Sequence, residues 1–269
     1  MNDTARSVLV TGASAGIGMA CADRLHAAGW TVTGGSRRGT SSGGWTGLVM
    51  DVDDTESVRS GVAAVLARSG RIDAVVTAAG WGLAGAVECS AIDEAKAQLE
   101  TNFWGTIHVV QEVLPAMRAS GGGRIVLMSS IGGVIGIPFQ AYYSASKFAL
   151  EGFGEALAYE VAPFGVQVTL VQPGNVRTDF TTSRKMARAA ADDTAYAAVS
   201  SKAISLMERD ERNGVPAADV ADVVLRVLGS PRPPRRVSVG KTAERAGLLA
   251  KRLLPFRAFE ASARNSLGV

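Results

Sequence analysis

The chain of 269 residues is 47% hydrophobic and 20% charged, with a formal net charge of +3. This composition excludes a coiled coil and a disordered chain, and the scattered basic residues form no dense stripe that would indicate a nucleic-acid partner. The two cysteines and two histidines form no metal-binding motif, so no metal is expected, and no apolar run approaches the ~20 residues that span a bilayer.

Up to Pro173, short apolar runs alternate with segments of helical periodicity. The expected strands are residues 7–11, 31–33 with a continuation, 48–50, 74–77, 124–128 and 166–171. The expected helices are residues 17–28, 55–67, 92–117 and 143–161, the third of them broken or closed near Pro115. Strands that alternate with helices build a parallel sheet with helices on both faces. We therefore predict an α/β fold, a single-domain Rossmann-type doubly wound parallel sheet of about seven strands.

The rest of the chain is expected to belong to the same domain, which then spans residues 1–269, because no linker or repeat separates it. Residues 180–213 are polar and weakly helical, and a segment of this length predicts a lid over the substrate. A helix at 217–228 and a last strand at 236–239 follow. Residues 240–269 form a C-terminal helical tail with a basic amphipathic helix at 243–254. Such a helix more often caps a domain or a subunit contact than lies on a membrane, so membrane attachment is not expected.

A glycine-rich turn, TGASAGIG at residues 11–18, joins the first strand to the first helix. Glycines let the backbone approach a pyrophosphate, and the helix N-terminus offers unpaired N–H groups and a positive dipole end. Glycine-rich turns also join many strands to helices without binding anything, but the strand–turn–helix context favours a dinucleotide site. The predicted contacts from this loop are Gly12, Ser14, Ala15, Gly16, Ile17 and Gly18.

The segment YSASK at residues 143–147 places Tyr143 and Lys147 one helical turn apart on the same face. An ammonium near the phenol is expected to lower its pKa from about 10 and to make Tyr143 a general acid/base. Ser130 ends the preceding strand, at the carboxyl edge where open α/β sheets bind ligands, and is expected to hydrogen-bond the substrate oxygen. Taken alone, the Tyr–Lys spacing also fits a half-buried tyrosine beside a surface lysine.

Together these motifs resemble the short-chain dehydrogenase/reductase family in its compact one-domain branch. The resemblance runs from Val8 to about Thr178 and includes TNFWG at 101–105 and PGNVRT at 173–178, which is similar to the family's PGxVxT segment beside the nicotinamide. It implies that the catalytic residues are Asn102, Ser130, Tyr143 and Lys147. It further implies that Lys147 holds the nicotinamide ribose and that Asn102 supports a proton-relaying water. The segments GIPF at 136–139 and YYSASKFALEG at 142–152 look closest to hydroxysteroid and retinol dehydrogenases and related bacterial reductases.

The sequence departs from the family at residues 77–80, where TAAG replaces Asn-Asn-Ala-Gly. This puts in doubt the hydrogen bonds that an asparagine would supply to the central sheet. Two tryptophans are candidates for either the cleft or the core. Trp81 follows this turn, and Trp104 lies two residues after Asn102.

The end of the second strand favours NADP(H) over NAD(H). Ser36 occupies the position where NAD-dependent enzymes usually carry an acidic residue, and Arg37 offers a guanidinium suited to a 2′-phosphate. Arg38 is the second candidate for this contact. The alternative is that both arginines are ordinary charged residues of a loop. Ala15 weakens the case, because NADP enzymes of this family often carry a basic residue in the glycine loop. The predicted cofactor contacts outside that loop are Ser36, Arg37, Arg38, Asp51, Val52, Ala79, Gly80, Asn102, Tyr143, Lys147, Pro173, Gly174, Val176 and Thr178.

We therefore predict an NADP(H)-dependent oxidoreductase, of alcohol dehydrogenase or ketoreductase type, that interconverts a carbonyl and an alcohol. No Arg or Lys lies between Ser130 and Tyr143, so the expected substrate is a small, mainly apolar ketone or alcohol. The residues expected to wall the cleft are Val134, Ile135, Ile137 and Phe139. A non-catalytic NADP(H)-binding sensor or scaffold on the same fold is the alternative. The family resemblance implies a homodimer or homotetramer, and the absence of a secretory signal predicts the cytoplasm.

Overall fold

The computed structural model describes residues 5–191, 195–267 and 269 of the chain. Residues 1–4, 192–194 and 268 lie outside the described residues. The first group belongs to the expected domain, the second to the expected lid, and residue 268 to the expected C-terminal tail.

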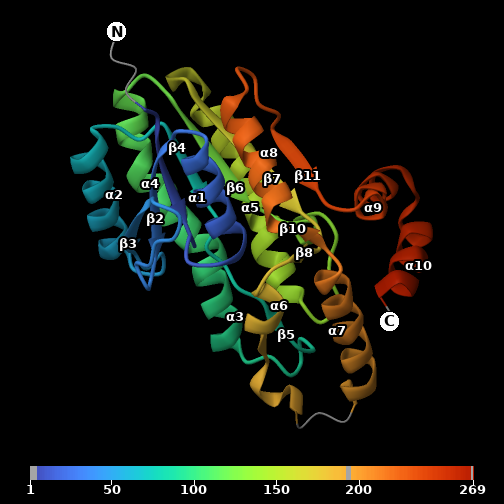
Figure 1. The fold of residues 1–269 in the computed structure, drawn as a ribbon. Helices are drawn as coiled ribbons and strands as arrows, with labels where there is room; N and C mark the ends of the chain where they lie inside the picture. The colour runs from blue at the N-terminus through green and yellow to red at the C-terminus, as the bar shows by residue number, and fades with distance from the viewer. Residues whose placement is uncertain (1–4, 192–194, 268) are drawn as a thin grey trace.

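Seven parallel strands form the central sheet, in the spatial order β11-β7-β6-β4-β1-β2-β3 (Figure 1). Their bounds are β1 (Ser7–Thr11), β2 (Thr31–Ser36), β3 (Thr46–Val49), β4 (Ala74–Thr77), β6 (Gly123–Met128), β7 (Val166–Pro173) and β11 (Arg236–Val239). The strand order reverses between β1 and β4, which is the point where open α/β sheets bind ligands. The predicted single-domain doubly wound sheet of about seven strands is confirmed.

Helices cover both faces of this sheet (Figure 1). On one face lie α1 (Gly16–Ala27) and α8 (Ala217–Gly229), and on the other lie α2 (Thr55–Ser69), α4 (Gly105–Ala119) and α5 (Ala141–Glu160). The expected helices and strands in these regions occur, with differences confined to their ends.

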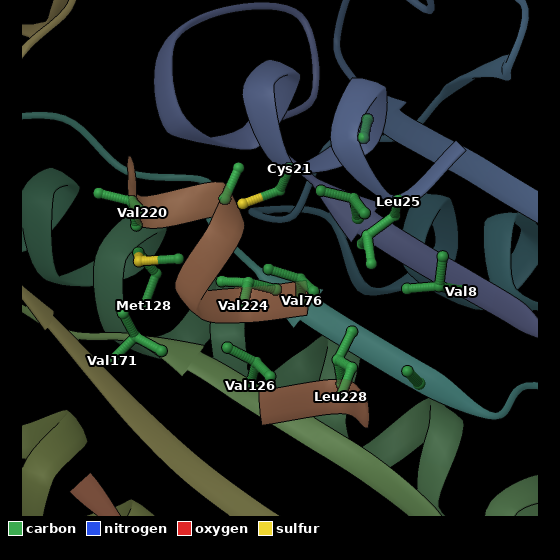
Figure 2. Close-up of a cluster of buried hydrophobic side chains, with 14 of the residues drawn as sticks. Val8, Cys21, Leu25, Val76, Val126, Met128, Val171, Val220, Val224 and Leu228 are labelled. Carbon is green, nitrogen blue, oxygen red and sulfur yellow. The ribbon is translucent and has the colours of Figure 1, made fainter. Parts of the chain in front are cut away.

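Buried side chains divide between the two faces as the alternation of a strand requires. Val8 and Val10 of β1 belong to the cluster under α1 and α8, whereas Leu9 between them belongs to the cluster under α2, α4 and α5. Figure 2 shows the first cluster, in which Cys21 and Leu25 of α1 meet the side chains of α8 above the strands. Burial on both faces explains why the strands read as continuous apolar runs.

The helical region at 92–117 is interrupted at Glu100–Trp104 and not at Pro115, and it ends at Ala119, four residues beyond that proline. The region consists of α3 (Ile92–Leu99), a π-helical turn η1 (Glu100–Trp104) and α4, and Pro115 lies inside α4. The wide turn is held by the side chain of Asn102, which hydrogen-bonds to the backbone of Trp81 and to Ser146. Such buried bonds stabilise the extra backbone width of a π-turn, and they cannot be read from local periodicity.

The region predicted as a lid contains several short elements below the sheet in Figure 1. They are α6 (Phe180–Ser183), β9 (Lys185–Met186), the 3₁₀ turn η4 (Arg188–Ala191) and α7 (Ala197–Arg212). β9 pairs with β5 (Leu83–Ala84), and β8 (Val176–Arg177) pairs with β10 (Val215–Pro216), so the region is tied to the body by backbone hydrogen bonds at both ends. Two further 3₁₀ turns are η2 (Ile131–Gly133) and η3 (Ala162–Phe164).

The C-terminal tail forms two helices, α9 (Thr242–Leu253) and α10 (Phe256–Leu267), which lie beside the body at the right of Figure 1. The sequence predicted a helical tail over 240–269 and gave bounds only for its first helix. Among the described residues, no helix combines the length and the hydropathy that crossing a membrane requires.

Candidate active site

A cavity of about 600 Å³ opens at the carboxyl edge of the sheet. Its wall is built from the loops that follow β1, β2, β3, β4, β6 and β7, together with the first turns of α5 and parts of the lid. Every predicted catalytic or cofactor-contacting residue lines this cavity except Asn102. Those lining it are Gly12, Ser14, Ala15, Gly16, Ile17, Gly18, Ser36, Arg37, Arg38, Asp51, Val52, Ala79, Gly80, Ser130, Tyr143, Lys147, Pro173, Gly174, Val176 and Thr178.

The glycine loop passes so close to other backbone atoms that two of its positions have no space for a Cβ. A Cβ on Gly12, whose φ is +68°, would lie 2.8 Å from the Cα of Ala79, and a Cβ on Gly18 would lie 2.3 Å from the carbonyl oxygen of Gly12. The loop therefore packs closely against the turn after β4. α1 then begins without a side-chain cap from the described residues and without an acidic residue in its first turn. Its free N–H groups and dipole end fit the pyrophosphate of a dinucleotide.

The turn at residues 77–80, where the sequence departs from the family, is bonded to a threonine. The hydroxyl oxygen of Thr11, at the end of β1, accepts hydrogen bonds from the backbone N–H groups of Ala78 (3.2 Å) and Ala79 (3.3 Å). Thr11 thereby links β1 to the turn after β4, whereas the buried hydroxyl of Thr77 has no partner among the described residues.

The two arginines after β2 have different surroundings. The guanidinium of Arg38 donates to the Ser14 hydroxyl (2.9 Å) and to the Ser14 carbonyl (3.3 Å), which places it against the glycine loop. Arg37 is exposed and lies near Asp53, whose pKa is raised mainly by burial and is partly lowered by Thr101 and Arg37. The hydroxyl of Ser36 accepts from the Gly39 N–H (3.1 Å). Sequence reasoning favoured Arg37, and it did not anticipate the contact between Arg38 and the loop.

Ser130 and Tyr143 line the cavity together, with the Ser130 hydroxyl close enough to the phenol to influence its pKa. Ser130 follows β6, and its hydroxyl accepts from the Gly132 N–H (3.0 Å) and donates to the Pro173 carbonyl (3.4 Å), which fixes its position. The Tyr143 ring packs edge-on against Phe180 with 5.7 Å between centroids. Burial raises the pKa of Tyr143, and the Ser130 hydroxyl opposes this shift.

Lys147 is buried one turn further along α5. Its ammonium donates to the Met128 carbonyl (2.8 Å) and lies 5.8 Å from the centroid of the Tyr143 ring. Burial lowers the pKa of Lys147 to about 8. The pKa of Tyr143 is raised and not lowered as predicted, because burial of the phenol dominates.

Asn102 is fully buried behind the cavity wall. Its amide donates to the Trp81 carbonyl (3.0 Å) and to the Ser146 hydroxyl (3.1 Å), and its carbonyl oxygen accepts from the Trp81 N–H (3.0 Å). The expected direct place of Asn102 in the cofactor site is therefore not observed, since these contacts use its polar atoms. Its side chain instead fixes the position of Trp81, which lines the cavity. Trp104 is 48% exposed and lines neither the cavity nor the core.

The predicted apolar wall is only partly correct. Of the four residues expected to form it, Ile137 lines the cavity, and Ile135 instead lines a second cavity of about 240 Å³ beside α10. Val134 and Phe139 line neither of these two cavities. Residues that the sequence reasoning did not identify supply much of the wall beyond Tyr143. They are Gln140, Phe180, Ser183, Lys185, Met207 and Glu211.

Charged residues of this wall have partners within the protein. The Lys185 ammonium lies 4.4 Å from the centroid of the Trp81 ring, a cation–π contact. The carboxylate of Glu211, on α7, pairs with the buried guanidinium of Arg184 and accepts from the Thr181 hydroxyl (2.7 Å). These contacts tie α6, β9 and α7 together across the cavity mouth.

A residue of the C-terminal tail also reaches the site. One carboxylate oxygen of Glu244, on α9, accepts from the Asn175 N–H (3.2 Å) and from the Asn175 side-chain amide (2.7 Å). Asn175 lines the cavity beside Gly174, and a Cβ on Gly174 would lie 2.2 Å from the other carboxylate oxygen of Glu244. The tail therefore supports the loop after β7, and no local motif signals this contact.

Comparison with known proteins agrees with this geometry. Residues 6–189 match the family model described as short chain dehydrogenase. The chain is similar to a 3-ketodihydrosphingosine reductase of Bacteroides thetaiotaomicron, with 39% identity over 92% of this chain and 93% of that protein.

Solved structures share the fold. A short-chain dehydrogenase from Streptomyces avermitilis has a TM-score of 0.84 and 31% identity, covering 99% of this chain and 100% of that one. A short-chain dehydrogenase/reductase from Burkholderia phymatum in complex with NAD has a TM-score of 0.78 at 21% identity, covering 94% of each chain. The family match over most of the chain, on a sheet and glycine loop of this geometry, shows that the protein belongs to the short-chain dehydrogenase/reductase family of NAD(P)(H)-dependent oxidoreductases.

Proposed function

We propose that the protein interconverts a ketone and an alcohol with NADP(H), and that Tyr143 is the general acid/base. The observation that carries the proposal is the meeting of Ser130, Tyr143 and Lys147 in the cavity that the glycine loop also lines. A sensor or scaffold has no need for a serine and a tyrosine together beside a buried lysine.

The protein's own residues act on the substrate oxygen. When bound, the nicotinamide cofactor supplies or accepts the hydride. In reduction, Tyr143 donates its phenolic proton to the carbonyl oxygen, and in oxidation it takes the hydroxyl proton back. Ser130 orients the same oxygen and the phenol through hydrogen bonds. Lys147 provides a positive charge near the phenol, 5.8 Å from its ring centroid, and this charge favours the phenolate when it forms.

The preference for NADP(H) is supported by the residues after β2. The cavity there presents Ser36, Arg37 and Arg38 and no carboxylate at the end of the strand. Arg38 lies beside Ser14 of the glycine loop and Arg37 lies near Asp53. A permanently charged guanidinium favours a 2′-phosphate, which a carboxylate at Ser36 would repel.

A mainly apolar substrate is supported by the wall beyond Tyr143. Ile137, Phe180 and Met207 contribute apolar surface, and two of the charged residues of this cavity, Lys185 and Glu211, have partners in Trp81 and Arg184. The name of the relative from Bacteroides thetaiotaomicron also specifies reduction of a keto compound. We propose the residues that line the cavity between the glycine loop and Thr178 as the cofactor site, and the lid as the substrate cover.

We further propose a homodimer or homotetramer in the cytoplasm. Large apolar rings stand exposed on the turn before α4 and on α5, where Trp104, Phe148 and Tyr159 are 48%, 42% and 69% exposed. An apolar face of this kind supports pairing of these helices across a two-fold axis.

The test of the proposed reaction is a panel of ketones and alcohols assayed by the change in NADPH absorbance, in wild type and in Tyr143→Phe. We expect turnover of apolar ketones by the wild type and a loss of about 10²–10⁴-fold in the variant, with NADPH affinity retained. Near-normal turnover by Tyr143→Phe would show that another group transfers the proton.

A further inference from the structure

The side-chain amide nitrogen of Gln140 is buried and has no hydrogen-bond partner among the residues that the structure describes. Gln140 precedes α5 and is 2% exposed, and it lines the cavity that contains Tyr143. Its backbone groups are used, since its N–H donates to the Ile137 carbonyl (3.1 Å) and its carbonyl accepts from the Ser144 N–H (2.9 Å). Its side-chain nitrogen, however, makes no hydrogen bond to any described residue. A buried donor without an acceptor is costly, so its presence beside a cavity calls for a ligand.

The side chain does not serve the helix either. Gln140 is the N-cap residue of α5, yet its amide makes no capping hydrogen bond with the described part of the chain. Glutamine is also not among the residues that cap helices well. The position is therefore not explained by the stability of α5.

The backbone before Gln140 is strained. Phe139 has a φ of +59°, and among the described residues it alone, apart from glycines, has a positive φ. Its carbonyl accepts a hydrogen bond from the Gly85 N–H (2.8 Å), which holds this conformation in place. Strain of this kind persists where the surrounding structure imposes it, and it is concentrated at ligand sites. Here it sets the direction in which the chain enters α5 at Gln140.

The helix places Gln140 on the substrate side of the site. Lys147 follows Tyr143 by four residues, and Gln140 precedes it by three, so along the helix axis the two lie on opposite sides of the tyrosine. Lys147 approaches the turn after β4, where a Cβ on Gly80 would lie 3.9 Å from its ammonium. Gln140 lies beside Ile137, whose carbonyl accepts from its N–H, and Ile137 also lines the cavity.

We infer that Gln140 is a specificity-determining residue, which donates a hydrogen bond from its side-chain amide to an oxygen of the substrate a few bonds from the reacting carbonyl. The carbonyl itself is taken by Tyr143 and Ser130, so the acceptor is a second group, such as a hydroxyl or ether oxygen. The substrate class is then an oxygen-substituted ketone with an apolar remainder, rather than a plain apolar ketone. This inference rests on the proposed function and deepens it.

The test compares kcat/KM for a linear methyl ketone, for the same ketone with a hydroxyl on the first or the second carbon beside the carbonyl, and for the corresponding methyl ethers. The wild type is expected to prefer one of the hydroxyketones by about 10–100-fold, the range of one hydrogen bond to a group otherwise left unpaired. Its methyl ether should retain the preference, because an ether oxygen still accepts. In Gln140→Met, which keeps the length of the side chain, the ratio of kcat/KM between the oxygen-substituted and the plain ketone should fall to about one.

Two controls separate specificity from structure. Gln167→Met replaces a glutamine of β7 whose amide donates to the Pro231 carbonyl and does not line the cavity, and it should leave the preference unchanged. The melting temperature of Gln140→Met should not fall, because the lost amide nitrogen has no partner among the described residues. A lower melting temperature together with an unchanged preference would assign Gln140 a structural role and overturn the inference.

The failures are distinguishable. Equal use of plain and oxygen-substituted ketones by the wild type, or a preference that survives in Gln140→Met, would overturn the role of Gln140 and leave the proposed function intact. Absence of turnover with every ketone would overturn the proposed function, and the role of Gln140 with it.

Discussion

Lys147→Met tests whether the structure assigns the right energetic role to the buried ammonium. Methionine preserves the length of the side chain and removes its charge. In the wild type, burial lowers the pKa of Lys147 from 10.5 to about 8, so the folded state binds this proton more weakly than the unfolded chain. Between these two values the unfolded chain holds more protons, and the stability of the wild type therefore rises with pH across this window.

The size of the effect follows from the same shift. The difference between pKa values of 10.5 and about 8 corresponds to roughly 3 kcal/mol. The charged lysine destabilises the folded protein by this amount below pH 8, and the destabilisation disappears as the pH approaches 10.5. Against this, the variant leaves the Met128 carbonyl without the donor that lies 2.8 Å away, at a pH-independent cost of about 1–3 kcal/mol. The variant is thus expected to be at least as stable as the wild type near neutral pH and less stable at high pH.

The measurement is urea unfolding of both proteins without cofactor, followed by tryptophan fluorescence from pH 7 to pH 10.5. The difference in free energy of unfolding, variant minus wild type, should fall by about 3 kcal/mol across this range. Exposed Lys202 on α7 offers the matched control, Lys202→Met, in which no such slope is expected. A difference for Lys147→Met that is constant with pH would refute the reasoning, because it would mean that the ammonium is not penalised by burial.

Three further predictions concern the cofactor and the assembly. Arg38→Ala and Arg37→Ala should each lower kcat/KM with NADPH and change kcat/KM with NADH little. The loss should be about 10–100-fold for the residue that contacts the 2′-phosphate. An unchanged ratio of kcat/KM with NADPH to kcat/KM with NADH in both variants would refute the NADP(H) assignment. Glu244→Ala should raise the cofactor KM and lower the melting temperature, because the two Asn175 donors lose their acceptor, and Glu244→Gln should do less of both. Light scattering at micromolar concentration should give the mass of a dimer or tetramer, and a monomer mass would contradict the proposed assembly.

Local features of the sequence determine much of this protein. Apolar runs and helical periodicity alternate along the chain, and a strand that follows a helix with a right-handed crossover has few places to pair other than a parallel sheet. The glycine spacing after β1 requires close backbone contacts, and Tyr143 and Lys147 share a helix face because they are four residues apart. These features act over a few residues, so the sequence alone predicts the sheet, the dinucleotide loop and the catalytic pair.

Only the tertiary structure decides the features that join distant segments. The π-turn depends on bonds from Asn102 to Trp81 and Ser146, and the support of Asn175 comes from Glu244, 69 residues away in sequence. The lid brings its own side chains to the cavity in place of most of the apolar wall that the sequence suggested.

The pKa values of Tyr143 and Lys147 are also decided by the tertiary structure. The spacing of Tyr143 and Lys147 predicts a lowered phenol pKa, yet in the folded chain the ammonium is held by Met128 and both groups are desolvated. Spacing along a helix determines which side chains are neighbours. The surrounding layers of the fold determine how much water those side chains lose, and that loss sets their pKa values and leaves the Gln140 amide nitrogen without a partner among the described residues.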